Sequence, residues 1–432
     1  MSLRWLLGSN PGQAKPRRGE RGRSFSVASI ASVALAVSSL GGLEVGTASA
    51  GSLFGAEGLG LPRSGYDLAA RGAGSTSIGL IDPFQSSVLN PGALGWTNRP
   101  QLYSGLFTES TWITTSATSS SDRVGGTRLA GVRAAVPISR LRFAAGFSDV
   151  TDARYSLDVL ENDGQPDEYV RHAEGTGGLS ELYGEVAVPI GTVASVGFRY
   201  AALGGTLREV REDLFTNSEF TVSESVLRTR LERGRTFTFG AQARPHASVG
   251  VGAYFGWGDD AALKSIYRSG SGLTSEERLK FELPPTFGFG ASVQVSPRWV
   301  VAFDLSETRW SESKTTLGRN AGNTSLDNLT DDRHFGVGLR RLGSPEPSNR
   351  VSSRTIWRAG FRWDELGLPD RGDPIQEWAL TGGVGLPIQL DRGYIDLLLE
   401  FGQRGDDATV GLRETFARLG VGATFQELRR AF

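Results

Sequence analysis

Apolar and polar residues alternate along most of the chain after residue 100. In residues 286–295, apolar side chains occupy the odd positions, whereas threonine, glycine, serine and glutamine occupy the even ones. The same division recurs in residues 357–363, 395–402 and 418–425, and the charged residues there stay on the less apolar face. A period of two predicts β-strands with one apolar and one polar face.

The pattern predicts fourteen strands joined by connections of alternating length. We expect them near residues 101–115, 126–138, 140–152, 179–190, 192–207, 234–244, 246–257, 281–295, 297–310, 332–342, 354–364, 376–388, 391–404 and 409–425. Short turns alternate with polar loops, expected near residues 116–125, 153–178, 208–233, 258–280, 311–331 and 365–375. An even number of strands with short turns on one side is typical of membrane barrels.

The composition of the two faces indicates which of them meets water. In a soluble sandwich the apolar faces pack against each other. Here one face is rich in phenylalanine and tryptophan, and the other carries glycine, serine, threonine and charged residues. This favours an all-β fold, a transmembrane antiparallel β-barrel with lipid outside and a polar lumen. A soluble all-β protein with wet outer faces is the alternative.

The first fifty residues have the features of an export signal. Basic residues precede a short apolar stretch at residues 25–40, and Ala48-Ser49-Ala50 offers a cleavage site before Gly51. We therefore expect a signal peptide at residues 1–50. No later apolar run is long enough for a spanning helix, so we expect the exported barrel in the outer membrane.

A barrel of this size needs something inside it. Fourteen strands about 4.8 Å apart, tilted by about 40°, close into a cylinder roughly 28 Å across. Residues 51–100 show little alternation and many small residues. We expect them to form an N-terminal plug, or hatch, and residues 101–432 to form the barrel. Repeated Gly-x-Gly pairs on the lumenal face would let the plug backbone approach the wall, although simple strand bending explains them equally well.

One stretch of the plug carries a family resemblance. A Gly/Ala/Arg-rich run at residues 69–77 is followed by Asp82 and then by Asn90-Pro91-Gly92-Ala93, shortly before the first strand. This resembles the hatch of the FadL/TodX (OMPP1) family of outer-membrane hydrophobic-compound transporters, and Leu-Pro-Pro-Thr-Phe-Gly-Phe-Gly at residues 283–290 adds to the likeness. Gly92 stands where the family more usually has alanine.

The resemblance implies passive transport of long-chain fatty acids or other hydrophobic compounds. The ligand would enter a lumenal pocket and leave sideways into outer-membrane lipid through a break in the wall when the hatch shifts. The family would place a kink in the third strand, here around Ala145 and Gly146. Each CH₂ moved from water to an apolar site gains about 0.8 kcal/mol, so no other energy source is needed. The alternative is a barrel of the same shape that serves as a structural or secretion-associated partner without transport.

Charge and composition exclude several other functions. The chain has 46 basic and 47 acidic residues, so it lacks the basic excess of a nucleic-acid-binding protein. It has no cysteine, and its histidines, His172, His246 and His334, are too scattered to share a metal. No Gly-x-Ser-x-Gly motif is present. We expect no metal, no cofactor and no enzymatic activity.

Arginines on the lumenal face are the candidates for chemistry. They are Arg133, Arg142, Arg199, Arg244, Arg340, Arg358, Arg362 and Arg418, and they share the lumen with Glu185, Asp304, Asp396 and Glu400. Arginine can hold a carboxylate with two parallel hydrogen bonds. A salt-bridge lattice that braces wall and plug is one interpretation. Ligand binding by Arg199 and Arg358, which lie mid-strand, is the other.

Overall fold

A computed structural model gives the architecture. It describes residues 51–63, 65, 67–82, 87–115, 118–162, 164, 165, 167–215, 222–313, 315, 316, 330–346, 348–368, 374–388, 392–406 and 411–426. The signal peptide expected at residues 1–50 lies outside the described residues. Among the described helices, none has the length and apolar character needed to cross a bilayer.

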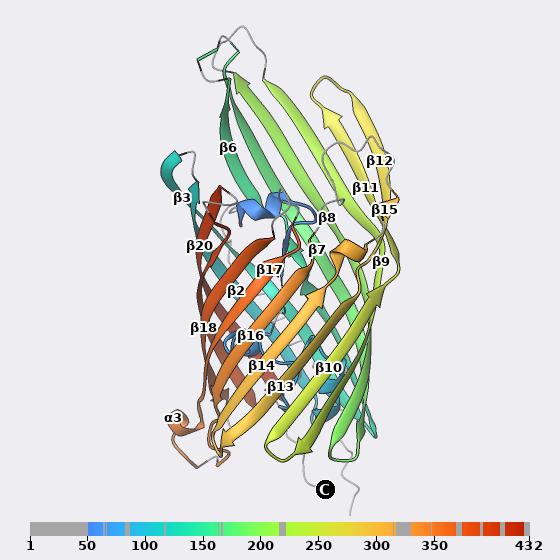
Figure 1. Ribbon diagram of the computed structural model, residues 1–432, viewed down its shortest axis with the longest axis vertical. Helices are drawn as coiled ribbons and strands as arrows, with labels where there is room; N and C mark the ends of the chain where they lie inside the picture. The colour runs from blue at the N-terminus through green and yellow to red at the C-terminus, as the bar shows by residue number, and fades with distance from the viewer. Residues whose placement is uncertain are drawn as a thin grey trace, which may run out of the picture. The chain divides into compact units, whose positions relative to one another are not determined.

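The described strands form a closed antiparallel barrel (Figure 1). Its fourteen wall strands are β2 (Gln101–Thr115), β3 (Thr118–Ile138), β4 (Leu141–Asp149), β7 (Tyr169–Ile190), β8 (Ala194–Phe215), β9 (Ser223–His246), β10 (Val249–Gly258), β13 (Thr286–Ser296), β14 (Trp299–Thr308), β16 (Asp332–Arg341), β17 (Ile356–Leu366), β18 (Ile375–Ile388), β19 (Gly393–Arg404) and β20 (Leu412–Gln426). β2 pairs with β20 from Gln101↔Gln426 to Thr115↔Leu412, which closes the barrel. The predicted fold class is confirmed.

Four further strands lengthen the wall on the side of the long connections. They are β6 (Tyr155–Glu161), β11 (Asp260–Ser269), β12 (Thr274–Glu282) and β15 (Thr315–Thr316). Together with the long upper parts of β7, β8 and β9, the first three of them occupy most of the described residues of 153–178, 208–233 and 258–280, where we expected loops. That expectation was wrong, because polar and apolar residues are mixed on the faces of these strands, which weakens the period-two signal.

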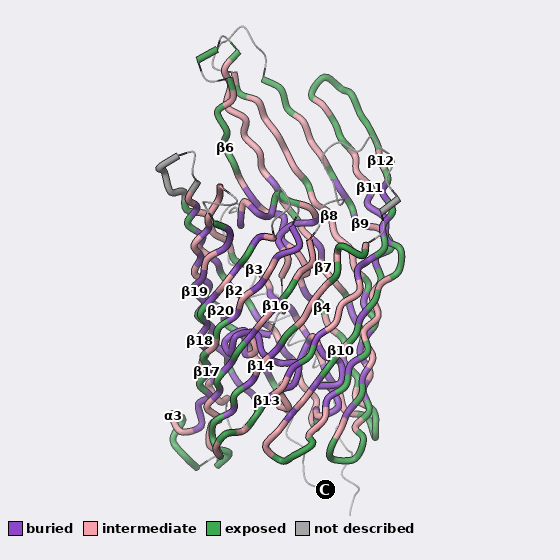
Figure 2. Tube along the Cα trace, viewed as in Figure 1, coloured by how far each residue is buried: buried purple, intermediate pink, exposed green. Residues whose placement is uncertain are grey.

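Apolar side chains lie on the outside of the barrel. Phe289, Trp357, Leu399 and Leu419 are 49%, 50%, 57% and 57% exposed, and each comes from a predicted apolar face. Their neighbours on the opposite face are buried in the lumen, among them Arg418, which is 2% exposed. Stripes of exposed residues follow the outer wall in Figure 2. The chain is therefore an outer-membrane barrel, with apolar residues toward lipid.

Residues 51–100, called the inner segment, lie against the lumenal face of the wall. Their described elements are η1 (Leu53–Ala56), β1 (Leu61–Pro62), α2 (Leu68–Arg71) and η2 (Pro91–Trp96). Asp67 begins α2 by accepting a hydrogen bond from the amide of Ala69 at 2.9 Å, and Asn90 begins η2 in the same way through Gly92. Most of the described residues of this segment are buried.

Apolar side chains inside the barrel form separate clusters. The largest joins Leu59 of the inner segment to wall residues that include Leu179, Leu231, Phe281 and Leu283. A second apolar cluster surrounds Leu68 and likewise joins the inner segment to the wall. Polar contacts fill much of the remaining lumen, as described next.

Candidate functional site

The predicted hatch motif is part of the inner segment and lies against strands β8 and β9. The side-chain amide of Asn90 donates to the carbonyl oxygens of Ile78 at 3.1 Å and of Ala241 at 2.9 Å. Asn90 is fully buried, and Pro91, Gly92 and Ala93 are buried beside it. A Cβ on Gly92 would lie 2.8 Å from the Cα of Ala241. A residue larger than glycine would push η2 away from β9.

Lumenal glycines let the inner segment approach the wall. A Cβ on Gly250 would lie 2.6 Å from the carbonyl oxygen of Gly79, and one on Gly338 would overlap the carbonyl oxygen of Ala73. In both cases the added Cβ would be closer to the carbonyl oxygen than van der Waals contact allows. The prediction that Gly-x-Gly pairs make room for the plug backbone is confirmed at these positions.

Charged wall residues bind the inner segment at several points along its length. Asp304 on β14 accepts from the amides of Ser77 at 2.5 Å and of Ile78 at 2.8 Å. Arg71 donates to Glu400 on β19 at 2.9 Å, and Arg340 on β16 donates to Asp82 at 3.0 Å. Asp304 was expected to face an arginine, and instead it binds backbone amides.

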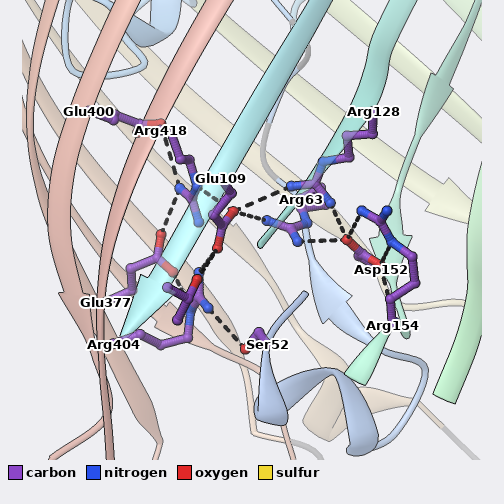
Figure 3. Close-up of polar contacts among 12 residues, drawn as sticks. Ser52, Arg63, Glu109, Arg128, Asp152, Arg154, Glu377, Glu400, Arg404 and Arg418 are labelled. Carbon is purple, nitrogen blue, oxygen red and sulfur yellow. Dashed lines mark hydrogen bonds and ion pairs between the residues drawn. The ribbon is translucent and has the colours of Figure 1, made fainter. Parts of the chain in front are cut away.

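A buried ion-pair network lies on the inner face of β17 to β20 (Figure 3). Glu377 accepts from three arginines: Arg362, Arg404 at 2.5 Å and Arg418 at 3.4 Å. These four side chains are at most 5% exposed. Together they brace the wall, as the lattice interpretation predicted.

The network continues to Glu109 on β2. Glu109 accepts from Arg418 at 2.7 Å and from Arg63 of the inner segment at 3.2 Å. Arg63 also donates to Asp152 at 2.9 Å, as Figure 3 shows. One chain of ion pairs therefore links β20, β2, the inner segment and the residues after β4.

Those residues turn inward from the wall. β4 ends at Asp149, and β5 (Thr151–Asp152) pairs with β1 of the inner segment before the wall resumes at Tyr155 in β6. Asp152 also accepts from Arg128 and Arg154. Burial alone would raise the pKa of Asp152, but the hydrogen bond from Arg154 and the charges of Arg63 and Arg128 hold it below its usual range. We call residues 150–154 the inward bend.

The wall is interrupted at the inward bend. β3 and β4 are paired from Ile138↔Leu141 to Gly131↔Ser148. Beyond this, β6 pairs with β7, and no pairing of β6 with β3 occurs among the described residues. The two strands therefore border an unpaired part of the wall. On the inner side of this unpaired part, the amides of Gly51 and Ser52 donate to the carbonyl oxygen of Arg154.

A cavity of about 360 Å³ lies between the inner segment and the upper wall. The inward bend contributes Val150 and Thr151 to it, and the largest apolar cluster contributes a continuous apolar side. The apolar lining residues from that cluster are Leu59, Leu179, Leu203, Leu231, Phe281, Leu283 and Trp310. The volume lies within the range of small-molecule pockets, about 300–1,000 Å³.

Polar groups line the opposite side of the cavity, beside α2. Asp67 lies there, and burial raises its pKa, with a further rise from Asp396, while the hydrogen bond from Ala69 opposes the change. The lining cations have carboxylate partners: Arg63 and Arg71 as above, Arg199 with Glu181, and Arg333 with Glu307 and Glu365. The positive charge around the cavity is thus compensated from within the protein.

The two predicted ligand arginines occupy different places. Arg199 lines the cavity, donates to the carbonyl oxygen of Val88 and to Glu181, both at 2.6 Å, and lies 3.8 Å over the ring of Tyr183. Arg358 does not line the cavity and donates to Asp396 at 2.7 Å with a fully buried side chain. The structure does not bring the two together.

Ala145 and Gly146, expected near a break in the wall, lie in the paired part of β4. Ala145 pairs with Ala134 and Gly184, and Gly146 pairs with Arg133 and Tyr183, without a register shift. The inward bend begins at Val150, a few residues further along the chain. Ala145 and Gly146 therefore lie on the strand that leads into the inward bend but not at the bend itself.

The three histidines lie on three different wall strands. His334 lines the cavity and its Nδ1 lies 2.6 Å from Asp364. His172 does not line the cavity. It lies on the outer part of β7, where its Nδ1 is 2.6 Å from Asp158. Within the described part of the chain, no group of three or more acidic, histidine or cysteine side chains could hold a metal ion.

Sequence reasoning missed several carboxylates of the network. Glu109, Glu377, Glu414 and Asp152 were not identified, although Arg133–Glu185 and Arg358–Asp396 pair as the lattice interpretation expected. Glu109 is directly opposite Arg418 in the β2–β20 pair. Aligning the first and last predicted strands would have revealed that pair, because closure of the barrel requires them to be neighbours.

Fold and lumen together define the class of the protein. The chain is an outer-membrane β-barrel with the fold of hydrophobic-compound transporters. Its structure is similar to the Ralstonia pickettii toluene transporter TbuX, with a TM-score of 0.56, 14% identity and coverage of 84% of this chain and 99% of that chain. It is also similar to the Pseudomonas putida toluene transporter TodX, with a TM-score of 0.55, 15% identity and coverage of 85% and 98%. A Pseudomonas aeruginosa FadL homologue gives a TM-score of 0.57 at 12% identity, with coverage of 85% and 99%.

The chain itself belongs to the BamG family. The model of that family matches residues 26–256 and 261–429, which is most of the sequence. None of the curated proteins matches the chain. The expected resemblance to the FadL/TodX transporters is confirmed at the level of the fold.

Proposed function

We propose that this barrel carries neutral hydrophobic compounds from the cell exterior into the outer membrane. A compound enters the cavity from the side of the long strands and binds against the apolar cluster. It then passes the inward bend and leaves sideways between β3 and β6. The observation that carries the proposal is the contact between the cavity and the inward bend, which adjoins the unpaired part of the wall. The toluene transporters named above have the same fold.

The inner segment has the contacts of a hatch. Arg63, β1 and Asp152 connect it to the inward bend, so a shift of the inner segment would move the bend. Transfer from water into the cavity and then into lipid is favourable for an apolar compound at about 0.8 kcal/mol per CH₂. The route therefore needs no coupled reaction. A barrel acting only as a structural partner would have no use for an apolar cavity at this position.

Compensated charge supports neutral compounds over fatty acids as the ligand. Arg199 lines the cavity but already donates to Glu181 and Val88. A ligand carboxylate would have to displace Glu181 and lose its own hydration. A neutral ring or chain meets neither cost.

Polar substitutions in the apolar lining test transport itself. We expect Leu203→Gln with Leu231→Gln to reduce uptake of radiolabelled toluene into cells by at least about tenfold, since each buried leucine contributes about 1.5–3 kcal/mol of apolar contact. Leu273→Gln is the matched control, because Leu273 is 65% exposed between β11 and β12. Folding is checked by the gel mobility of the unheated barrel. Normal uptake by a folded double variant would contradict the transport function and favour a partner role.

Removal of the partner of Arg199 tests the ligand class. We expect Glu181→Gln to raise uptake of decanoate relative to decanol by about tenfold, because among the described residues Arg199 then keeps only Glu185, at 3.7 Å, as a carboxylate partner and can hold a ligand carboxylate. Asp396→Asn is the control, since it removes a carboxylate that accepts from Arg358, which does not line the cavity. A wild-type barrel that already prefers decanoate over decanol would show that the ligand is an acid and that Arg199 binds it despite Glu181.

A further inference from the structure

Three arginines gather on the outer face of the long strands. Arg208 on β8 lies directly opposite Arg228 on β9. Arg230 lies two residues nearer the membrane along β9, opposite Thr206. All three side chains are exposed. On the opposite face of the same strands, Leu231 is buried in the largest apolar cluster and Leu207 packs against it, so the arginines point away from the lumen.

These arginines have no carboxylate partner in the described part of the chain. On the same face, Lys264 on β11 pairs with Glu276 at 2.8 Å, and Arg278 on β12 pairs with Glu232. The side chains of Arg208, Arg228 and Arg230 form no ion pair or hydrogen bond with any described residue. Like charges directly opposite each other destabilise a strand pair. An anion from outside the protein would remove that cost.

A hollow in the sheet lies between the arginines. Besides the three arginines, Thr176, Gly177, Gly205 and Thr206 line it. The two threonines add hydroxyl donors, and the two glycines leave the backbone uncovered. Arginine forks and hydroxyls are the groups that bind phosphate best in proteins. The hollow therefore has both the shape and the donors of a phosphate site.

The position of the hollow indicates where the phosphate comes from. Outer-face apolar residues on the membrane side of the hollow include Leu182 on β7, 64% exposed, and an aromatic group in which Tyr200 and Phe237 lie 5.5 Å apart, whereas Leu214, 43% exposed, lies on the far side of the hollow. Thr206 follows Ala202, the partner of Leu182, by four residues. At about 3.3 Å per residue and a tilt of about 40°, this is roughly 10 Å further from the membrane centre. Polar lipid headgroups occupy this height, and arginine side chains can reach down to them.

We propose that Arg208, Arg228 and Arg230 bind the phosphate of a phosphorylated lipid in the outer leaflet. The lipid chains lie along the apolar face below, beside Leu182 and Tyr200. Its headgroup fills the hollow and neutralises the opposed arginines. The site is on the outside of the wall and is independent of the cavity and of transport.

Lipid retention measured by native mass spectrometry tests the site. The full-length barrel in detergent is mixed with dioleoyl phosphatidate, which has a terminal phosphate, or with dioleoyl phosphatidylcholine, which has the same chains and a masked phosphate. We expect wild-type barrel to retain at least about tenfold more phosphatidate, a difference that added salt reduces. Arg208→Gln with Arg228→Gln should abolish the preference.

The control removes the same charge from the same face. Lys264→Gln with Arg278→Gln deletes two cations that already have partners, so retention of phosphatidate should stay at the wild-type level. Equal retention by the Arg208/Arg228 variant and the wild type would overturn the proposal. Binding of inorganic phosphate alone as tightly as phosphatidate would also overturn it, because the site would then recognise a free anion.

Discussion

Substitution of Gly338 by valine is expected to detach the inner segment and open the barrel to small solutes. Gly338 on β16 faces the lumen, where an added Cβ would overlap the carbonyl oxygen of Ala73 and lie 2.5 Å from the hydroxyl oxygen of Thr76. Overpacking of this kind costs about 1–3 kcal/mol. Such a change shifts a docking equilibrium by about 5- to 150-fold. Liposomes containing the variant should therefore swell in arabinose faster than those containing the wild type.

Gly184→Val is the control for this experiment. Gly184 lies on the outer face of β7, and no atom lies within 4 Å of a Cβ built there. The same residue type is thus introduced into a wall strand without touching the inner segment, and swelling should stay at the wild-type rate. If a folded Gly338→Val barrel swelled no faster than Gly184→Val, the inner segment would not be what closes the lumen.

The wall of the barrel could be predicted from the sequence because one physical contrast runs along every strand. Lipid on one side and a filled lumen on the other produce a period of two, and Gln101–Thr115 was predicted to the residue. The contrast ends where the strands leave the membrane. The upper halves of β7, β8 and β9 have polar residues on both faces, so their pairing could not be distinguished from loops.

The candidate site could be predicted only in part, because it depends on which strands face each other across the lumen. Arg199 was identified from its position in a strand, and the structure places it in the cavity wall. Its pairing with Glu181 follows from the register of β7 and β8, which alternation alone does not determine. The inward bend at residues 150–154 has no local signal either. Asp152 is held there by Arg63, which is 89 residues away in sequence.

Loss of the carboxylate of Glu377 is expected to have the largest effect on stability. Arg362, Arg404 and Arg418 all donate to it, and their side chains are at most 2% exposed. Glu377→Gln keeps the size of the side chain but leaves the three buried guanidiniums with one negative charge fewer. Removing one partner of a buried ion pair typically costs about 3–5 kcal/mol. The temperature at which half of the barrel loses its folded gel mobility should fall clearly below that of the wild type.

The same substitution at a solvated ion pair provides the comparison that gives this result its meaning. Glu232 pairs with Arg278, whose side chain is 52% exposed, and an exposed pair contributes about 0–1 kcal/mol. Glu232→Gln should therefore unfold within about 4 °C of the wild type, since about 1 kcal/mol shifts the midpoint of a 150–250-residue domain by about 2–4 °C. Equal midpoints for the two variants would show that water or other carboxylates compensate the Glu377 arginines. The network would then serve to position the inner segment through Arg63 and Glu109 rather than to stabilise the wall.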